Sequence, residues 1–314
     1  MKNKLKNQVT LPVIVAPMFL VSGPKLVIES CRAGIIGSFP LLNARSSKIL
    51  EEWFIEIKEA LALSKDEKVA PWAVNYIVHR TNKRLEEDLQ LIEKYQPPIV
   101  ITSLGHPGPI VEVVKNYGGL VFSDVTTIRH AEKAAESGVD GLILVCNGAG
   151  GHAGLINPFA FMGAVKSFWK GTIIVSGGIS TGRDILAVQA MGADFAYMGT
   201  RFIATEESIA TDIYKEMLVD STLDDLIYTD AFSGVHANYL VPSIVNVGLD
   251  PTKLVSKETV SITKMNDPKA WRDIWSAGQG VNLVDKVQPI RSLINELKSE
   301  YEIGLKELNI INEK

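Results

Sequence analysis

The sequence predicts an α/β protein, and more narrowly a closed (β/α)8 TIM barrel that carries a small inserted second domain. One observation is an alternation: across residues 13–199 of the 314-residue chain, short β-branched runs are followed by amphipathic segments. A second is that these runs are almost wholly apolar, as in a parallel sheet covered on both faces. The third is that the runs number eight, which favours a closed barrel over a doubly wound open sheet.

Each predicted element has a local signal. The strands are the apolar runs at residues 13–18, 35–39, 72–78, 99–104, 120–125, 141–145, 172–177 and 194–199. Segments between them place apolar residues three and four positions apart and have a glycine near several of their ends, which predicts helices. The clearest of these are residues 46–63, 82–96, 127–138 and 181–192.

The alternation stops near residue 205. Residues 206–274 combine a helical, a loop-rich and a polar stretch without repeating the βα unit, and helical periodicity returns from residue 282. We therefore expect a barrel domain formed by residues 1–205 and 275–314. Residues 206–274 are the predicted cap, a small domain that contributes to substrate binding.

Charge and cysteine content exclude several classes of function. The 32 basic and 36 acidic residues give a net charge of -4, which offers no general attraction to nucleic acid or to an anionic membrane. No apolar run approaches the roughly 20 residues of a membrane helix, and the N-terminal stretch lacks a signal-peptide cleavage pattern. Cys31 and Cys146 lack metal-ligand spacing, so we expect no metal and a cytoplasmic location. A small-molecule partner fits best.

Two glycine motifs predict a phosphate site. "SGGIS" (176–180) ends the seventh predicted strand and precedes a helix, and "MGTRF" (198–202) ends the eighth. Glycines let backbone N–H groups approach an anion, and a helix N-terminus adds partial positive charge. Barrels build phosphate sites after strands seven and eight. The candidate residues are Ser176, Gly177, Gly178, Met198, Gly199 and Thr200.

A third glycine-rich stretch, "CNGAGGHAG" (146–154), follows the sixth strand and contains His152. A loop histidine commonly bonds only a neighbouring carbonyl group. At the carboxyl end of a barrel strand, however, it lies where active sites form, and its ring titrates near neutral pH. The position of His152 between Gly151 and Gly154 therefore favours a catalytic role.

The order of five motifs narrows the function. "VIVAPM", "AGGHAG", "SGGIS", "GADFAYMGTRFIAT" and "WSAGQG" follow one another along nearly the whole chain. In this combination the sequence resembles the nitronate monooxygenase family, formerly called 2-nitropropane dioxygenases. The resemblance implies an FMN-dependent (β/α)8 barrel with a small, mainly helical second domain. It also implies oxidation of alkyl nitronates, and of nitroalkanes in some cases, with O2 to a carbonyl compound and nitrite.

The resemblance also implies roles for individual residues. It places Ala16, Pro17 and Met18 against the flavin ring and Asn75 at its polar edge. It assigns the phosphate to Gly177, Gly178, Gly199 and Thr200, and closure of the pocket to Gln279 and Gly280. His152 matches the active-site histidine, which either takes a proton from a nitroalkane or, when protonated, stabilises the anion. The further candidate cofactor contacts are Ser103, Asp124, Gly150, Gly151, Ser176 and Met198.

Three other positions bear on the site. Some relatives place a basic residue against the flavin near Asp124, so the acidic side chain here leaves its effect on flavin reactivity open. His106 follows the fourth strand and His236 lies in the cap, and both are candidate substrate contacts. His79 and His130 are interpreted as structural.

Two other functions stay open at this point. A flavin-dependent enoyl-acyl-carrier-protein reductase is a related barrel with a similar "AGGH" loop, and it requires NAD(P)H. A flavin-free barrel that binds a phosphate ligand without redox chemistry is the second. The sequence determines neither the physiological substrate, nor reduction by NAD(P)H, nor whether the chain forms a homodimer.

Overall fold

The computed structural model describes residues 2–64, 68–256 and 272–312. Its main sheet has eight parallel strands in the order β1-β9-β8-β6-β5-β4-β3-β2. The strands are β1 (Val13–Val15), β2 (Ser38–Pro40), β3 (Ala73–Ile77), β4 (Ile99–Ser103), β5 (Leu120–Val125), β6 (Gly141–Val145), β8 (Thr172–Ser176) and β9 (Phe195–Met198). The predicted TIM barrel is confirmed.

The sheet closes between its first two strands. Ile14 of β1 forms a parallel bridge with Ile36, which lies just before β2. The Val15 N–H group donates to the Ile36 carbonyl at 2.8 Å, and the Ile36 N–H group donates to the Val13 carbonyl at 3.1 Å. These two bonds join the outer strands, so the eight strands form a nearly closed ring.

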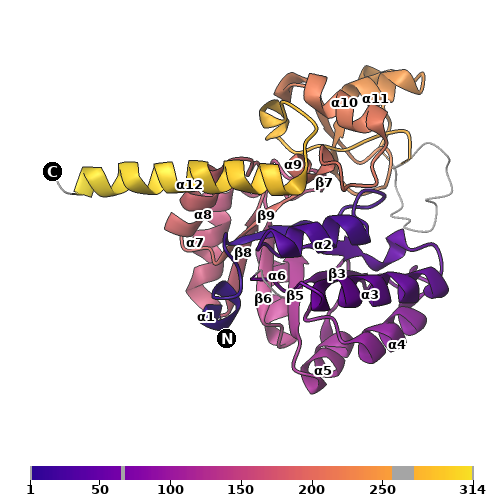
Figure 1. Ribbon diagram of the computed structural model, residues 1–314. Helices are drawn as coiled ribbons and strands as arrows, with labels where there is room; N and C mark the ends of the chain where they lie inside the picture. Colours follow the sequence, from indigo (N-terminus) through magenta and orange to yellow (C-terminus); the bar gives the residue numbers. More distant parts are fainter. Residues whose placement is uncertain (1, 65–67, 257–271, 313–314) are drawn as a thin grey trace.

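Helices surround this ring (Figure 1). They are α2 (Pro24–Arg32), α3 (Ser47–Ala62), α4 (Leu85–Tyr95), α5 (Gly108–Asn116), α6 (Ile128–Glu136), α7 (Pro158–Phe168) and α8 (Gly182–Ala190). A short α1 (Lys2–Lys6) precedes the barrel, and the last helix, α12 (Ile290–Asn312), packs against α8 and α2. The chain therefore returns after the small domain to cover the gap between the last and first barrel helices, and the end of α12 projects beyond the barrel.

The barrel has two buried apolar layers because side chains alternate along each strand. In β6, Leu142 and Leu144 face the surrounding helices, whereas Ile143 belongs to the cluster inside the barrel. The inner cluster also contains Ile14, Ile101, Phe122, Ile174 and Phe195. This apolar filling occupies the middle of the barrel, so a ligand can be admitted only at an end.

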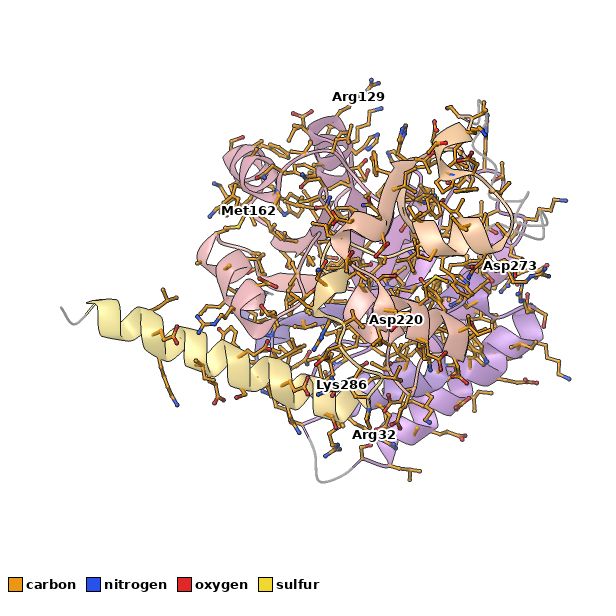
Figure 2. All side chains as sticks on the ribbon, turned by 90° about the horizontal axis from the view of Figure 1, so that it is seen from above. Arg32, Arg129, Met162, Asp220, Asp273 and Lys286 are labelled. Carbon is orange, nitrogen blue, oxygen red and sulfur yellow. The ribbon has the colours of Figure 1, made fainter. Side chains whose placement is uncertain are left out.

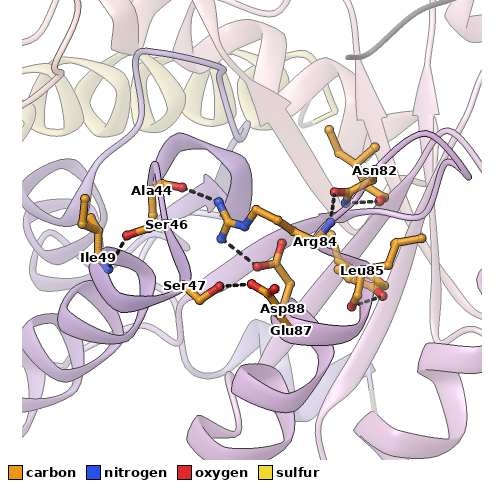
Figure 3. A network of polar contacts seen from close by, with 11 residues as sticks. Ala44, Ser46, Ser47, Ile49, Asn82, Arg84, Leu85, Glu87 and Asp88 are labelled. Carbon is orange, nitrogen blue, oxygen red and sulfur yellow. Dashed lines mark hydrogen bonds and ion pairs between the residues drawn. The ribbon is translucent and has the colours of Figure 1, made fainter.

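A polar network fixes the segment after β3 (Figure 3). Arg84 donates to the Ala44 carbonyl and forms an ion pair of 2.7 Å with the buried carboxylate of Asp88 in α4. Asn82 donates to the Ile77 carbonyl at 2.9 Å and accepts from the Arg84 N–H group at 3.0 Å. Burial raises the pKa of Asp88 to about 6, although Arg84 opposes the shift. The network joins the start of α4 to the loop before α3.

The segment between β9 and α12 contains α9 (Thr200–Ile203), α10 (Asp212–Asp220), β10 (Leu226–Thr229), β11 (Ala237–Leu240) and α11 (Val241–Asn246). Figures 1 and 2 show this small domain over one end of the barrel, with Asp220 central in the view from above. The small sheet has the order β10-β11-β7, and β7 is Gly151–His152. The strands of this small sheet were not expected from the sequence, and the boundary at residues 206–274 stays a prediction. No helix among the described residues combines the length and apolarity needed to cross a membrane.

Candidate active site

A cavity of about 740 Å³ opens at the carboxyl ends of the barrel strands, beneath the small domain. Most of the residues that the sequence indicated line it. They are Ala16, Pro17, Met18, Asn75, Ser103, His106, Asp124, Gly150, Gly151, His152, Ser176, Gly177, Gly178, Gly199, Thr200 and Gly280. Three of the indicated residues, Met198, Gln279 and His236, lie outside this lining.

The three residues outside the lining still have definable positions. Met198 is buried in the layer between sheet and helices, and its carbonyl accepts the Ala16 N–H group at 2.8 Å. Gln279 packs its side chain beside Gly148. The ring of His236 stacks on Tyr228 with centroids 5.0 Å apart. Met198 and Gln279 therefore support residues of the cavity, whereas the His236 ring lies against the small sheet.

Two glycines after β8 form a cradle of backbone N–H groups. Gly177 has φ +123° and Gly178 has φ +70°, and a Cβ atom on Gly177 would lie 2.5 Å from the Asn147 carbonyl oxygen. Only glycine fits both the conformation and the space at residue 177. Within the described chain, the N–H groups of Gly177, Gly178 and Ile179 donate no hydrogen bond. These three N–H groups border the cavity and can bind an anion.

The N-terminus of α8 contributes less than the sequence suggested. Thr181 caps the helix, and the Asp184 carboxylate accepts the N–H groups of Ser180 at 2.9 Å and Thr181 at 2.8 Å. Glu300 of α12 accepts the Gly182 N–H group at 2.6 Å. Because two carboxylates already bind the first amides of the helix, an anion in the cavity depends on the cradle before Ser180.

A segment from the C-terminal part of the chain closes one side of the cavity. The Gly278 N–H group donates to Thr200 Oγ1 at 2.8 Å, and the Gln279 N–H group donates to the Gly148 carbonyl at 2.8 Å. A Cβ atom on Gly150 would lie 2.7 Å from the Gly278 nitrogen. Gly150, in the loop after β6, must therefore be a glycine, because the backbone at Gly278 packs directly against it.

His152 comes from this same glycine-rich stretch, as part of β7. It pairs with Ala237 of β11, so the small sheet fixes its backbone. Its Nε2 atom lies 3.1 Å from Ser233 Oγ, and Ser233 Oγ lies 2.9 Å from the Val235 carbonyl oxygen. Burial lowers the pKa of His152 to about 4, so the imidazole is neutral at pH 7.

A second titratable group lies on the barrel wall. Ser103 donates to Asp124 Oδ2 at 2.6 Å, and Asn75 donates to Ser103 Oγ at 2.7 Å. Burial raises the pKa of Asp124 to about 7, while the hydrogen bond from Ser103 lowers it. The cavity therefore contains a histidine with a lowered pKa and a carboxyl group with a raised pKa.

Other lining residues were not singled out from the sequence. Tyr197 on β9 faces the cavity from inside the barrel, and Lys133 also lines it. His79 and His130, which were interpreted as structural from the sequence, line the cavity as well. Ser233 contacts His152 from a turn that is distant in the sequence. The period-two alternation of β9 could have indicated Tyr197, since it follows inward-facing Phe195 by two residues. Nothing local to Ser233 indicates its contact with His152.

Fold and cavity together define a (β/α)8-barrel protein with a ligand cavity at the carboxyl ends of its strands and a second domain above it. A family model described as nitronate monooxygenase matches residues 2–300. The chain belongs to this family, whose members are flavin-dependent oxidoreductases, and the resemblance in its sequence motifs is confirmed.

Individual relatives are distant. A probable nitronate monooxygenase of Staphylococcus haemolyticus (strain JCSC1435) is 28% identical, over 68% of this chain and 66% of that protein, just under two thirds of its length. A nitronate monooxygenase of Paraburkholderia phytofirmans (strain DSM 17436 / LMG 22146 / PsJN) is 25% identical, over 88% of this chain and 83% of that protein. The solved nitroalkane oxidase of Streptomyces ansochromogenes has a TM-score of 0.80 at 21% identity, covering 97% of this chain and 99% of that one. The structural likeness therefore supports the fold.

Proposed function

We propose that this protein is an FMN-dependent nitronate monooxygenase. It oxidises alkyl nitronates, and nitroalkanes once they are deprotonated, with O2 to a carbonyl compound and nitrite. The observation that carries the proposal is the joint position of two features in one cavity: the neutral imidazole of His152 and the anion cradle at Gly177 and Gly178. Membership of the nitronate monooxygenase family supports it.

The cavity offers contacts for both ends of FMN, the phosphate group and the flavin ring. A phosphate group can accept hydrogen bonds from the N–H groups of Gly177 and Gly178, which have no partner in the described chain. Gly199 and Thr200 border the same region, and a Cβ atom on Gly199 would meet Met18 Sδ at 3.4 Å. For the ring we assign the segment Ala16, Pro17 and Met18, with polar contacts from Asn75, Ser103 and Asp124. Bound FMN would supply the oxidation of the substrate and the reaction with O2.

The protein would supply the proton transfer. The Ser233 hydroxyl has one hydrogen, and when this is donated to the Val235 carbonyl, Ser233 can only accept from His152 Nε2. Nδ1 is then the basic nitrogen of the ring. A neutral nitroalkane would transfer its α-carbon proton to the imidazole of His152, which gives the nitronate and an imidazolium ring. Because the pKa of His152 is lowered, the base role is favoured over that of a resident cation.

The test begins with purified protein and its colour. We expect the protein to bind FMN, and anaerobic addition of propionate 3-nitronate should bleach the flavin absorption. Admission of O2 should then restore the absorption and release nitrite. NADH and NADPH are added to separate samples, and His152→Gln protein serves as the matched control with a neutral nitroalkane as substrate.

The alternatives give different results. Bleaching by NADH or NADPH but not by the nitronate would overturn the proposal in favour of the reductase. Colourless protein that does not bind added FMN would overturn it in favour of a flavin-free barrel that binds a phosphate ligand. His152→Gln protein that keeps full activity on the nitroalkane would remove the histidine from the mechanism.

A further inference from the structure

The inner wall of the cavity carries a chain of polar side chains that the proton transfer above does not use. Asn75, Ser103 and Asp124 lie near the carboxyl ends of the adjacent strands β3, β4 and β5. Each lies two residues beyond an inward-facing apolar residue, so all three point into the barrel. They form the polar layer immediately above the apolar filling.

The direction of the hydrogen bonds in this chain is fixed by a backbone carbonyl. Asn75 Nδ2 lies 3.2 Å from the Ile101 carbonyl oxygen, which can only accept, so the side chain presents its NH2 group there. The same Nδ2 donates to Ser103 Oγ at 2.7 Å. Ser103 therefore directs its one hydrogen to Asp124 Oδ2, at 2.6 Å.

Asp124 Oδ2 is consequently an acceptor, and a proton on this carboxyl group must lie on Oδ1. Oδ1 is buried and has no hydrogen-bond partner among the described residues. No described lysine, arginine or histidine forms an ion pair with Asp124. A buried carboxylate without a cation is strongly disfavoured, whereas a neutral carboxylic acid is tolerated. The raised pKa of Asp124, about 7, agrees with this arrangement.

A second buried donor belongs to the same wall. The Tyr197 hydroxyl on β9 is buried without a hydrogen-bond partner in the described chain. Burial raises the pKa of Tyr197, and the neighbouring Asp124 adds to the shift. Both side chains line the cavity. Two unpartnered buried polar groups in one cavity indicate that a ligand supplies their partners.

We propose that Asp124 is a neutral carboxylic acid whose Oδ1–H group donates a hydrogen bond to an acceptor atom of the bound cofactor, with Ser103 and Asn75 as positioning residues and Tyr197 as a second donor. This inference rests on the proposed function for the identity of the ligand, which is FMN. In this role Asp124 donates a hydrogen bond and presents no negative charge to the flavin. An ionised Asp124 would instead repel an electron-rich ring.

Other titratable groups share the cavity. His152 approaches from the small sheet, Tyr214 from α10, and Tyr197 from β9. The lining also includes His79, His106, His130 and Lys133. The test therefore compares wild-type protein with Asp124→Asn protein, which keeps these other groups and lacks only the carboxyl group.

The first measurement needs no flavin. Infrared difference spectra of the flavin-free protein between about pH 5 and pH 9 should show the loss of a carboxylic-acid carbonyl band in wild-type protein. Asp88, whose pKa is about 6, also contributes to this band, so Asp124→Asn protein should retain that contribution and lose the part that belongs to Asp124. In Ser103→Ala protein the band should persist to higher pH, because the hydrogen bond that lowers the pKa of Asp124 is removed. A structural role for Ser103 alone would not move this titration.

The second measurement is the dissociation constant of FMN, obtained from flavin fluorescence as a function of pH. If only neutral Asp124 donates, the ratio of wild-type to Asp124→Asn constants should rise about tenfold between pH 6 and pH 8. Taking the ratio cancels the titration of the FMN phosphate itself. Tyr197→Phe protein should bind FMN roughly fivefold more weakly. The pH midpoint of its FMN affinity should be the same as in wild-type protein.

The outcomes separate this inference from the proposed function. A wild-type infrared titration identical to that of Asp124→Asn protein, or a ratio of FMN dissociation constants independent of pH, would overturn the inference. Protein that shows the band but does not bind FMN would overturn the proposed function and the assignment of the ligand. If Asp124→Asn protein does not fold, the shift of the infrared titration in Ser103→Ala protein decides the protonation state.

Discussion

Replacing His152 by Gln is the sharpest perturbation of the site, because the amide can still bond to Ser233 but cannot titrate. Burial lowers the pKa of His152 from 6.5 to about 4. For a base with a lowered pKa in the folded state, stability is fully present above the unfolded pKa and is lost as the pH falls through the folded pKa. Wild-type protein should therefore lose stability on acidification through this residue, and the variant should not.

The magnitude follows from the two pKa values. Between pH 7 and pH 5 the unfolded histidine takes up a proton that the folded one refuses, which costs about 2 kcal/mol of unfolding free energy. Urea unfolding of flavin-free wild-type and His152→Gln protein at the two pH values measures the difference. The gap between the two proteins should change by about 2 kcal/mol, to the disadvantage of the wild type at low pH.

The pH dependence of the kinetics is a second test of the lowered pKa of His152. In the free enzyme the acid limb of kcat/KM for a nitroalkane should reflect the lowered pKa of His152, so activity should persist well below pH 6.5. His152→Gln protein should lose most of its turnover while it still binds FMN. An acid limb at pH 6.5, or a stability gap that does not change with pH, would refute the reasoning from burial.

Three further changes test other parts of the structure. Gly177→Ala should weaken FMN binding more than tenfold, since the new methyl group would lie 2.5 Å from a carbonyl oxygen at a φ of +123°. Fluorescence titration measures the FMN affinity. An unchanged affinity would show that the cradle is not part of the cofactor site. Arg84→Met should lower the free energy of unfolding by about 3 kcal/mol at pH 8. The loss should be smaller at pH 5, because Asp88, with a pKa of about 6, takes up a proton there. Equal losses at the two pH values would contradict the buried ion pair. Ser233→Ala removes the hydroxyl that lies 3.1 Å from the imidazole of His152. It should lower kcat/KM roughly fivefold without changing the FMN affinity. An equal loss of FMN affinity would indicate a general disturbance of the small domain.

Much of the barrel could be predicted from the sequence because its signals are local. Apolar β-branched runs predicted six strands to within two residues at each end. The exceptions are β1, which ends three residues earlier than predicted, at Val15, and β2, which lies at Ser38–Pro40. There the residues before the strand, among them Ile36, bond to β1 and close the barrel. Ser46, Thr127 and Thr181 begin their helices with side chains that accept backbone N–H groups, and such caps can be seen in the sequence.

The small sheet could not be predicted in this way. Its strand β7 is two residues long, contains a glycine, and pairs with Ala237 and Asn238, which lie more than eighty residues later. Neither β-propensity nor alternation is defined over two residues. The pairing exists because the small domain folds back over the barrel, and it is this pairing that holds His152 in the cavity.

The barrel and the positions of the glycine cradle and of His152 follow from local sequence patterns, because strand periodicity and glycine requirements are properties of neighbouring residues. The protonation of the site depends on the folded structure. The pKa of His152 is lowered and that of Asp124 raised because both are buried, and burial depends on segments that are distant in the chain. The folded structure also decides that Asp184 and Glu300 occupy the first amides of α8, which leaves the N–H groups of Gly177 and Gly178 for a ligand.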